Sequence, residues 1–234
     1  MAEDDAEDDL DQLIRRVDPD RWLASRFIAD AAARTDVVAL YAFDHELARA
    51  HRAASTSLLA EIRLAWWREA LDEIFAGARP VRRHPVVEAL ATAIRGRNLL
   101  RAPFDVMVEG QIEALDLELG PAEALAWADA VEGSLAVLAA QALDPAAPAD
   151  AARPAGRAWG LALLRRAGKA TPGVVDSLLR EALAEARAAA RRLSVAALPA
   201  ALPARLARAD LAGRGPGQLG KQLSLVLGAA TGRV

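Results

Sequence analysis

The chain has 234 residues, a net charge of −3 and no cysteine. The weakly acidic balance gives no electrostatic case for nucleic-acid binding, and the absence of cysteine excludes disulfides and thiol chemistry. Hydrophobic residues make up 53% of the sequence, which is enough for one sizeable core. Because β-branched residues are sparse, we expect an all-α protein.

Residues 1–17 open with an acidic run and are predicted to form a mobile N-terminal segment, followed by a single helical domain over residues 18–234. Asp18 and Pro19 are typical of a helix start, because Asp caps the first turn and Pro fits the first helical position. Thr35 is the next predicted cap. The break at Ser55–Ser57 predicts a third helix start.

The third helix carries two adjacent tryptophans, Trp66 and Trp67. Ile62, Trp66 and Ile74 recur at helical spacing, and so do Leu64 and Trp67. A helix with apolar residues on two faces is either a wide core helix or a helix beside a deep pocket.

Further helices are predicted from Pro85, Pro103 and Pro121, where proline again marks the first turn. Residues 144–154 are rich in Pro and Ala and are expected to form a surface loop before a helix over residues 155–167. Thr171 and Pro172 then predict a long helix, and later prolines divide the C-terminal part into short helices. No apolar run reaches the length of a membrane span, and the N-terminus lacks the pattern of a signal peptide.

Candidate chemical groups are few. The three histidines show no metal-ligand spacing, and no nucleophilic triad or glycine-rich phosphate loop is visible. Asp44 and Glu46 flank His45, and Glu109 and Glu113 stand four apart on one helix face. Carboxylates at that spacing either hold Mg²⁺ or form a solvated face.

The order of several segments resembles the squalene/phytoene synthase family, above all the bacterial relatives of the mitochondrial complex I assembly factor in that family. The segments that carry this resemblance are Asp20–Ser25, Ala39–Phe43, Glu46–Ala48, Glu61–Leu64, Trp66–Arg68, His84–Val86, Arg101–Pro103 and Glu109–Gly110. The resemblance implies a single-domain isoprenoid-synthase-like helical bundle with a central cavity. Active members condense two prenyl diphosphates head to head and hold Mg²⁺ with two aspartate-rich motifs.

This sequence departs from those motifs. The first should fall at about Ala48 and Arg52 and the second near Ala167, and none of these residues is acidic. Our preferred hypothesis is therefore a non-catalytic family member, with no catalytic residue, metal or other cofactor, that binds a lipid or isoprenoid or assists respiratory-complex assembly. One alternative is an active prenyltransferase that uses Mg²⁺ with atypical acids, and the other is a helical scaffold without a ligand.

For the preferred hypothesis we expect an apolar pocket between the helices that carry Tyr41, Trp67 and Met107. Its mouth would be near Asp44, His45, Glu109 and Glu113. The predicted partners are an isoprenoid or lipid and a protein of respiratory-complex assembly, with no nucleic acid. The expected location is the cytoplasm, where peripheral contact with the inner face of the membrane is compatible with the sequence.

Overall fold

The computed structural model describes residues 2–52, 56–115, 119–169, 172–211 and 217–234, and within these ranges it contains helices and no strand. The all-α prediction is confirmed. The α-helices are α1 (Ala2–Val17), α2 (Pro19–Ser25), α3 (Ala31–Arg52), α4 (Ser57–Phe75), α5 (Pro85–Arg97), α6 (Ala102–Glu113), α7 (Pro121–Trp127), α8 (Ser134–Leu143), α9 (Ala149–Ala167), α10 (Pro172–Ala189), α11 (Leu202–Leu211) and α12 (Gln218–Thr231).

Three short segments of other helix types complete the described part of the chain. A π-helical segment, η1 (Ala128–Gly133), joins α7 to α8 without a break. The 3₁₀ segments η2 (Ala190–Arg192) and η3 (Leu198–Ala201) lie between α10 and α11. In this part of the chain no helix is long and apolar enough to cross a bilayer.

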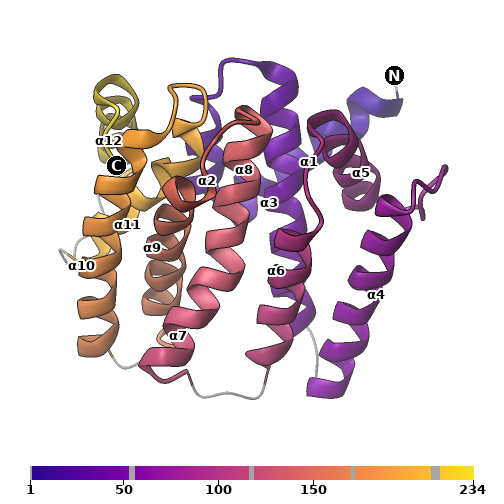
Figure 1. The fold of residues 1–234 in the computed structure, drawn as a ribbon, viewed down its shortest axis with the longest axis horizontal. Coiled ribbons are helices and arrows are strands. Elements are labelled where there is room, and N and C mark those ends of the chain that lie inside the picture. Colours follow the sequence, from indigo (N-terminus) through magenta and orange to yellow (C-terminus); the bar gives the residue numbers. More distant parts are fainter. Residues whose placement is uncertain (1, 53–55, 116–118, 170–171, 212–216) are drawn as a thin grey trace.

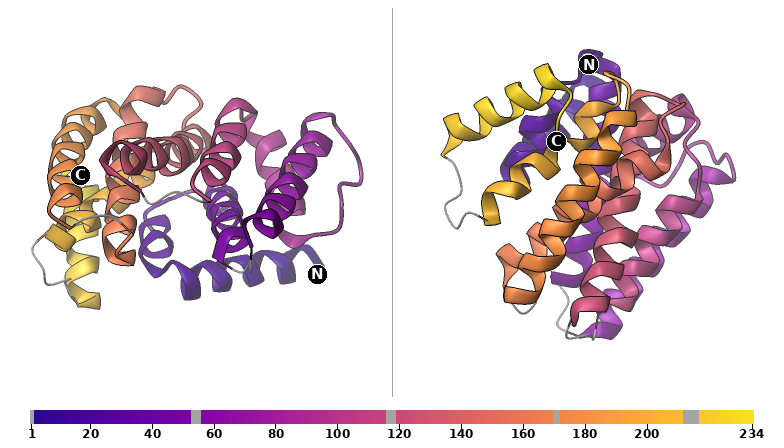
Figure 2. Two further views of the ribbon diagram at one scale, coloured as in Figure 1. Left: turned by 90° about the horizontal axis from the view of Figure 1, so that it is seen from below. Right: turned by 60° about the vertical axis from the view of Figure 1, so that its left-hand side comes forward.

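The long helices stand roughly upright and side by side, from α4 at one end of the molecule to α10 at the other (Figure 1). The view from below shows α1 lying across them along one side (Figure 2). Helix α12 lies at the outer edge, where it packs against α11.

Local capping explains several helix starts. The Asp18 carboxylate accepts a hydrogen bond from the Arg21 backbone N–H at 3.0 Å, and Thr56 caps α4 in the same way. The predicted cap at Thr35 is wrong. Helix α3 already begins at Ala31, because Asp30 accepts from the Ala33 N–H at 2.9 Å.

Two other expectations change with the structure. Helix α9 begins at Ala149, so the predicted loop over residues 144–154 is shorter and Pro154 lies inside the helix. Of the N-terminal segment that was expected to be mobile, residues 2–17 form α1, in which Leu10 and Ile14 are buried against the core. The side chains of residues 2–9 lie outside what the structure describes.

Two buried apolar clusters make up the core. One is built mainly from α1, α3, α4, α5, α6 and α8, and the other mainly from α2, α9, α10 and α11. Phe43 occupies the middle of the first cluster, with its ring 5.4 Å from Trp67 and 5.7 Å from Phe104. Trp67 is buried, whereas Trp66 is half-buried under Arg82 and His84. The two tryptophans therefore have different roles in the packing.

Candidate functional site

A pocket with a volume of about 1250 Å³ lies between the first and second halves of the chain. The C-terminal end of α1, with α2, α3, α6, η1 and α9, supplies most of its lining. The walls of the pocket are apolar over much of their area. The apolar lining residues are Val17, Ala48, Ala114, Leu115, Leu119, Trp127, Trp159, Leu163, Leu164 and Ala167. A cavity of this size and character suits an organic ligand with a long apolar part.

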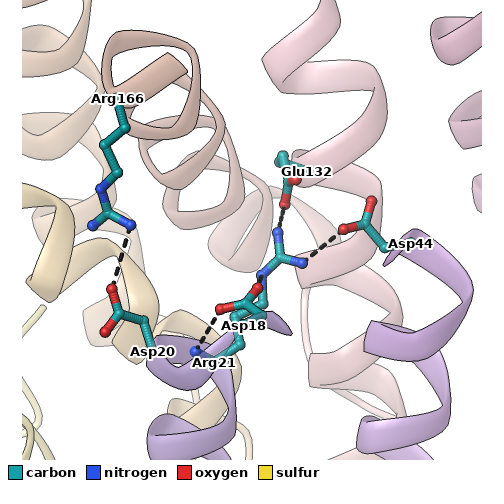
Figure 3. A network of polar contacts seen from close by, with 6 residues as sticks. All are labelled: Asp18, Asp20, Arg21, Asp44, Glu132 and Arg166. Carbon is teal, nitrogen blue, oxygen red and sulfur yellow. Dashed lines mark hydrogen bonds and ion pairs between the residues drawn. The ribbon is translucent and has the colours of Figure 1, made fainter. Parts of the chain in front are cut away.

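Arg21 is the buried polar centre of the pocket. Its guanidinium is shared by three carboxylates from separate elements (Figure 3). Nη1 is 2.8 Å from Asp44, Nε is 3.4 Å from Asp18, and Nη2 donates a short hydrogen bond to Glu132. The same guanidinium lies 5.4 Å from the ring of Tyr41. The arrangement joins α2, α3 and η1 at a single side chain.

One arginine faces three acids here, and burial, together with the neighbouring charges, shifts their pKa values. Burial raises the pKa of the Glu132 carboxyl to about 8, against the opposing pull of Arg21. Burial also raises the pKa of Asp18. Burial opposes the charge on Arg21, but Glu132, Asp18 and Asp44 together raise its pKa well above the ordinary value. The guanidinium therefore stays charged.

A second ionic group stands beside the first. Asp20 of α2 accepts from Lys221 of α12 at 2.6 Å and from Arg166 of α9 at 3.3 Å. The Arg166 guanidinium also lies 4.6 Å from the ring of Trp159. All four carboxylates among the residues that line the pocket, Asp18, Asp20, Asp44 and Glu132, are thus bound to cationic side chains.

Three of the predicted site residues lie in this pocket. Tyr41, Asp44 and His45 of α3 line it. Burial lowers the pKa of His45, and the positive charge of Arg52 acts in the same direction. Burial raises the pKa of Tyr41, so its hydroxyl stays protonated.

The other four predicted residues lie elsewhere. Trp67 and Met107 are buried in the core. Glu109 is exposed and pairs with Arg68 at 2.5 Å, and Glu113 is exposed at the end of α6. The physical reason is the helical repeat: α6 turns Gln111 toward the pocket, and Ala114 and Leu115 just after its end also line it, so Glu109 and Glu113 point to another side.

Sequence reasoning missed the partners of Asp44. Arg21 stands next to a predicted helix start, but no pattern in the sequence indicated its ion pairs. Glu132 had one signal, because it and Asp129 are the two acids of the otherwise apolar stretch 124–140, and a carboxylate in such a stretch is buried only when it is paired.

The residues present do not fit a Mg²⁺ site. Within the described ranges no group of three or more His, Cys, Asp or Glu residues is placed to hold a metal ion. The pocket-lining carboxylates are already bound by Arg21, Arg166 and Lys221. Ala48, Arg52 and Ala167, which stand near the positions of the family's acids, line the same pocket. They offer no carboxylate oxygen to a metal ion.

The arrangement of the helices is shared with two solved structures. A dehydrosqualene synthase in complex with ligand matches with a TM-score of 0.79 at 16% identity, over 98% of this chain and 97% of that one. The squalene synthase HpnC from Alicyclobacillus acidocaldarius matches with a TM-score of 0.68 at 14% identity, over 97% of this chain and 94% of that one. The fold is therefore that of the isoprenoid synthases.

The family follows from the sequence itself. Residues 14–168 match the model of the squalene/phytoene synthase family. The chain belongs to that family. A comparison with curated protein sequences gives no significant match.

Proposed function

We propose that this protein binds an isoprenoid or another single-chain lipid in its central pocket and does not condense prenyl diphosphates. The observation that carries the proposal is the combination of a pocket of about 1250 Å³ with a lining that lacks free carboxylates among the described residues. The volume suits a chain-like ligand. The ionic groups do not suit a metal-held diphosphate.

The alternative of catalysis by atypical acids has little support in the geometry. Asp44 is bound to Arg21, Glu46 pairs with Arg49 at 3.1 Å, and Glu109 pairs with Arg68. Head-to-head condensation requires acids that gather around the leaving diphosphate with Mg²⁺. Asp44 is buried in the pocket, whereas Glu109 is exposed on α6 outside the pocket lining.

Thermal unfolding with farnesol tests the binding proposal. A ligand that binds only the native state adds about 2.7 kcal/mol at a hundredfold excess over its Kd, which corresponds to a rise in Tm of about 5–10 °C for a protein of this size. Native mass spectrometry should show one bound chain. Ala48→Phe narrows the pocket and should abolish the rise, whereas Ala65→Phe, at an exposed position of α4, should retain it.

Incubation with Mg²⁺ and radiolabelled farnesyl diphosphate tests the second half of the proposal. We expect no condensed product. Turnover that is lost in Asp44→Asn would overturn it and favour the alternative. A role in respiratory-complex assembly stays a prediction, to be tested by comparing the respiratory subunits that co-purify with the wild type and with Ala48→Phe.

A further inference from the structure

Helix α12, at the outer edge of the molecule, turns a row of large apolar side chains to solvent (Figure 2). Their exposed fractions are 76% for Leu219, 65% for Leu223, 49% for Val226 and 54% for Leu227. Because residues four, three and one apart share a side of a helix, the four form one stripe, called here the outward face. The buried residues of α12, Leu225 and Gly228, lie on its other side. A contiguous apolar stripe of this kind marks an interaction surface, whereas single exposed apolar residues do not.

A cationic side chain borders the outward face. Arg205 of α11 donates a hydrogen bond from Nε to the Ser224 Oγ at 3.1 Å, and its Cδ would lie 2.8 Å from a Cβ added to Gly228. Ser224 and Gly228 each directly follow a leucine of the outward face. Since successive residues are about 100° apart around a helix, Arg205 lies about a quarter of a turn from that face.

Two more arginines stand close to Arg205. Burial lowers the pKa of Arg205, and the positive charges of Arg208 and Arg187 act in the same direction. Arg187 and Arg208 are exposed, and no carboxylate among the described residues forms an ion pair with any of the three. We call these three residues the arginine group. The outward face is therefore bordered by positive charge that the described acids leave uncompensated.

The combination favours an anionic bilayer as the surface that covers the outward face. An apolar helix face flanked by cationic side chains is typical of helices that lie in the interface of an anionic membrane. A second copy of the chain fits less well, because a two-fold contact through α12 would bring two arginine groups together. The face is also small. A helix of 14 residues presents about 21 Å by about 10 Å, against about 800 Å² per partner in a standard protein interface.

Helix α4 provides a contrast within the same molecule. Leu58 and Ile62 are also exposed there, with exposed fractions of 64% and 57%. Charges of both signs, Glu61 and Arg63 among them, are interleaved with these residues. An anionic surface would attract some of these side chains and repel others, so α4 lacks the charge pattern found beside α12.

We infer that the outward face of α12 docks on the surface of an anionic lipid bilayer, with the arginine group among the lipid headgroups. The four apolar side chains would enter the boundary between headgroups and acyl chains, and the buried side of α12 would stay packed against α11. The inference goes beyond ligand binding in the central pocket and does not depend on it.

Flotation with lipid vesicles tests the inference. One set of vesicles contains phosphatidylcholine alone, and the other contains phosphatidylcholine mixed with phosphatidylglycerol. The wild type should float with the mixed vesicles and bind phosphatidylcholine alone at least about tenfold more weakly, because each arginine near an anionic surface adds about fivefold in affinity. Binding to the mixed vesicles should fall as NaCl is raised, since exposed charges are screened.

Variants separate the two parts of the surface. Leu223→Glu combined with Leu227→Glu should reduce binding to the mixed vesicles by about tenfold or more. Arg187→Gln combined with Arg208→Gln should weaken binding to the mixed vesicles by about tenfold and leave the weak binding to phosphatidylcholine unchanged. The matched control is Leu58→Glu combined with Ile62→Glu on α4, which should bind like the wild type. An unchanged Tm checks that each variant is folded.

A fluorescent label shows which helix meets the lipid. The chain has no cysteine, so Leu223→Cys and Ile62→Cys each introduce a single labelling site. An environment-sensitive fluorophore on the first should shift its emission to the blue when mixed vesicles are added. The same fluorophore on the second should not change.

Several results would overturn the inference. It is wrong if the wild type does not float, if the α12 leucine variant floats like the wild type, or if the label on α4 responds in place of the label on α12. Equal binding to both kinds of vesicle at every salt concentration would exclude the role of the arginine group. Light scattering that shows a wild-type dimer, and a monomer for the α12 leucine variant, would assign the face to a second copy. The vesicles contain no isoprenoid, so none of these results bears on the pocket.

Discussion

Arg21 is the residue through which the pocket is organised, because its guanidinium is the common partner of three buried or half-buried carboxylates. A buried ion pair is retained only where the remaining hydrogen-bonding capacity is satisfied, and removing one partner leaves an uncompensated charge. Burial raises the pKa of Glu132, and the nearby charges of Asp44 and Asp18 act in the same direction. The stability of the protein should therefore depend on the protonation of this carboxyl.

We predict that Glu132→Gln removes part of the loss of stability with rising pH. The carboxyl has a pKa of about 8 in the folded protein against an ordinary value of 4.5, so its favourable contribution is fully present below about pH 4.5 and is lost as the pH rises through about 8. Urea unfolding at pH 5 and at pH 8 measures the effect. The wild type should lose more stability between these two pH values than the variant does.

The stability lost between pH 5 and pH 8 is compared between the wild type and Glu132→Gln. The contributions of other groups that titrate in both proteins therefore cancel. Glu61, an exposed acid of α4, supplies the matched substitution Glu61→Gln. Equal losses in the wild type and in Glu132→Gln would show that Glu132 is already ionised at pH 5.

At the scale of elements, the close approach of α9 to η1 determines where Glu132 is held. Gly156 and Gly160 stand one turn apart on α9 and face this π-helical segment. A Cβ on Gly156 would overlap the Glu132 carbonyl oxygen and would lie 2.8 Å from the Ala136 Cβ. The absence of side chains at these two positions is what allows the backbones to meet.

Gly156→Ala should therefore destabilise the protein by about 1–3 kcal/mol or more, because the atom in the way is backbone and must shift. It should also move Glu132 away from Arg21 and weaken ligand binding. Gly96→Ala is the matched control. Apart from its chain neighbours and the backbone of its own helix, no atom lies within 4 Å of a Cβ added there, and alanine is the better helix former, so stability should rise slightly. Chemical denaturation measures the free energy of unfolding of both variants. An unchanged stability of Gly156→Ala would contradict the tight contact.

At the scale of the whole molecule, the two apolar clusters meet across the pocket, and Trp22 and Leu193 pack against both. The helices differ greatly in how much they contribute to this core. Nearly every residue of α8 is buried, whereas α12 buries only Leu225 and Gly228 and leaves Leu219 and Leu223 exposed. Burial, more than helicity, sets the local free energy of opening.

Hydrogen exchange should reveal this difference. We predict that the amides of α8 exchange only on global unfolding and that the amides of α12 exchange fastest among the long helices, although both are hydrogen-bonded throughout. Exchange followed by mass spectrometry measures the rates. The prediction fails if peptides from α12 are as protected as those from α8.

The helical class, several helix starts and the family could be predicted from the amino-acid sequence. Asp18 and Thr56 cap their helices through contacts three residues away, so a local pattern was sufficient. Apolar spacing also predicted that Trp66 and Trp67 would contribute to the core. The family's motif positions fall near Ala48, Arg52 and Ala167, and all three residues line the pocket.

The polar residues of the site could not be predicted in this way, because they come together only when the helices pack. Arg21 and Glu132 are 111 positions apart, and no local periodicity predicts that pairing. Glu109 and Glu113 looked equally suitable in the sequence, but the rotation of α6 turns Gln111 inward in their place. Helical spacing determines which residues share a face, and packing against other helices determines where that face points. The site residues depend on the second of these, because side chains from α2, α3, η1 and α9 meet only after the helices have packed.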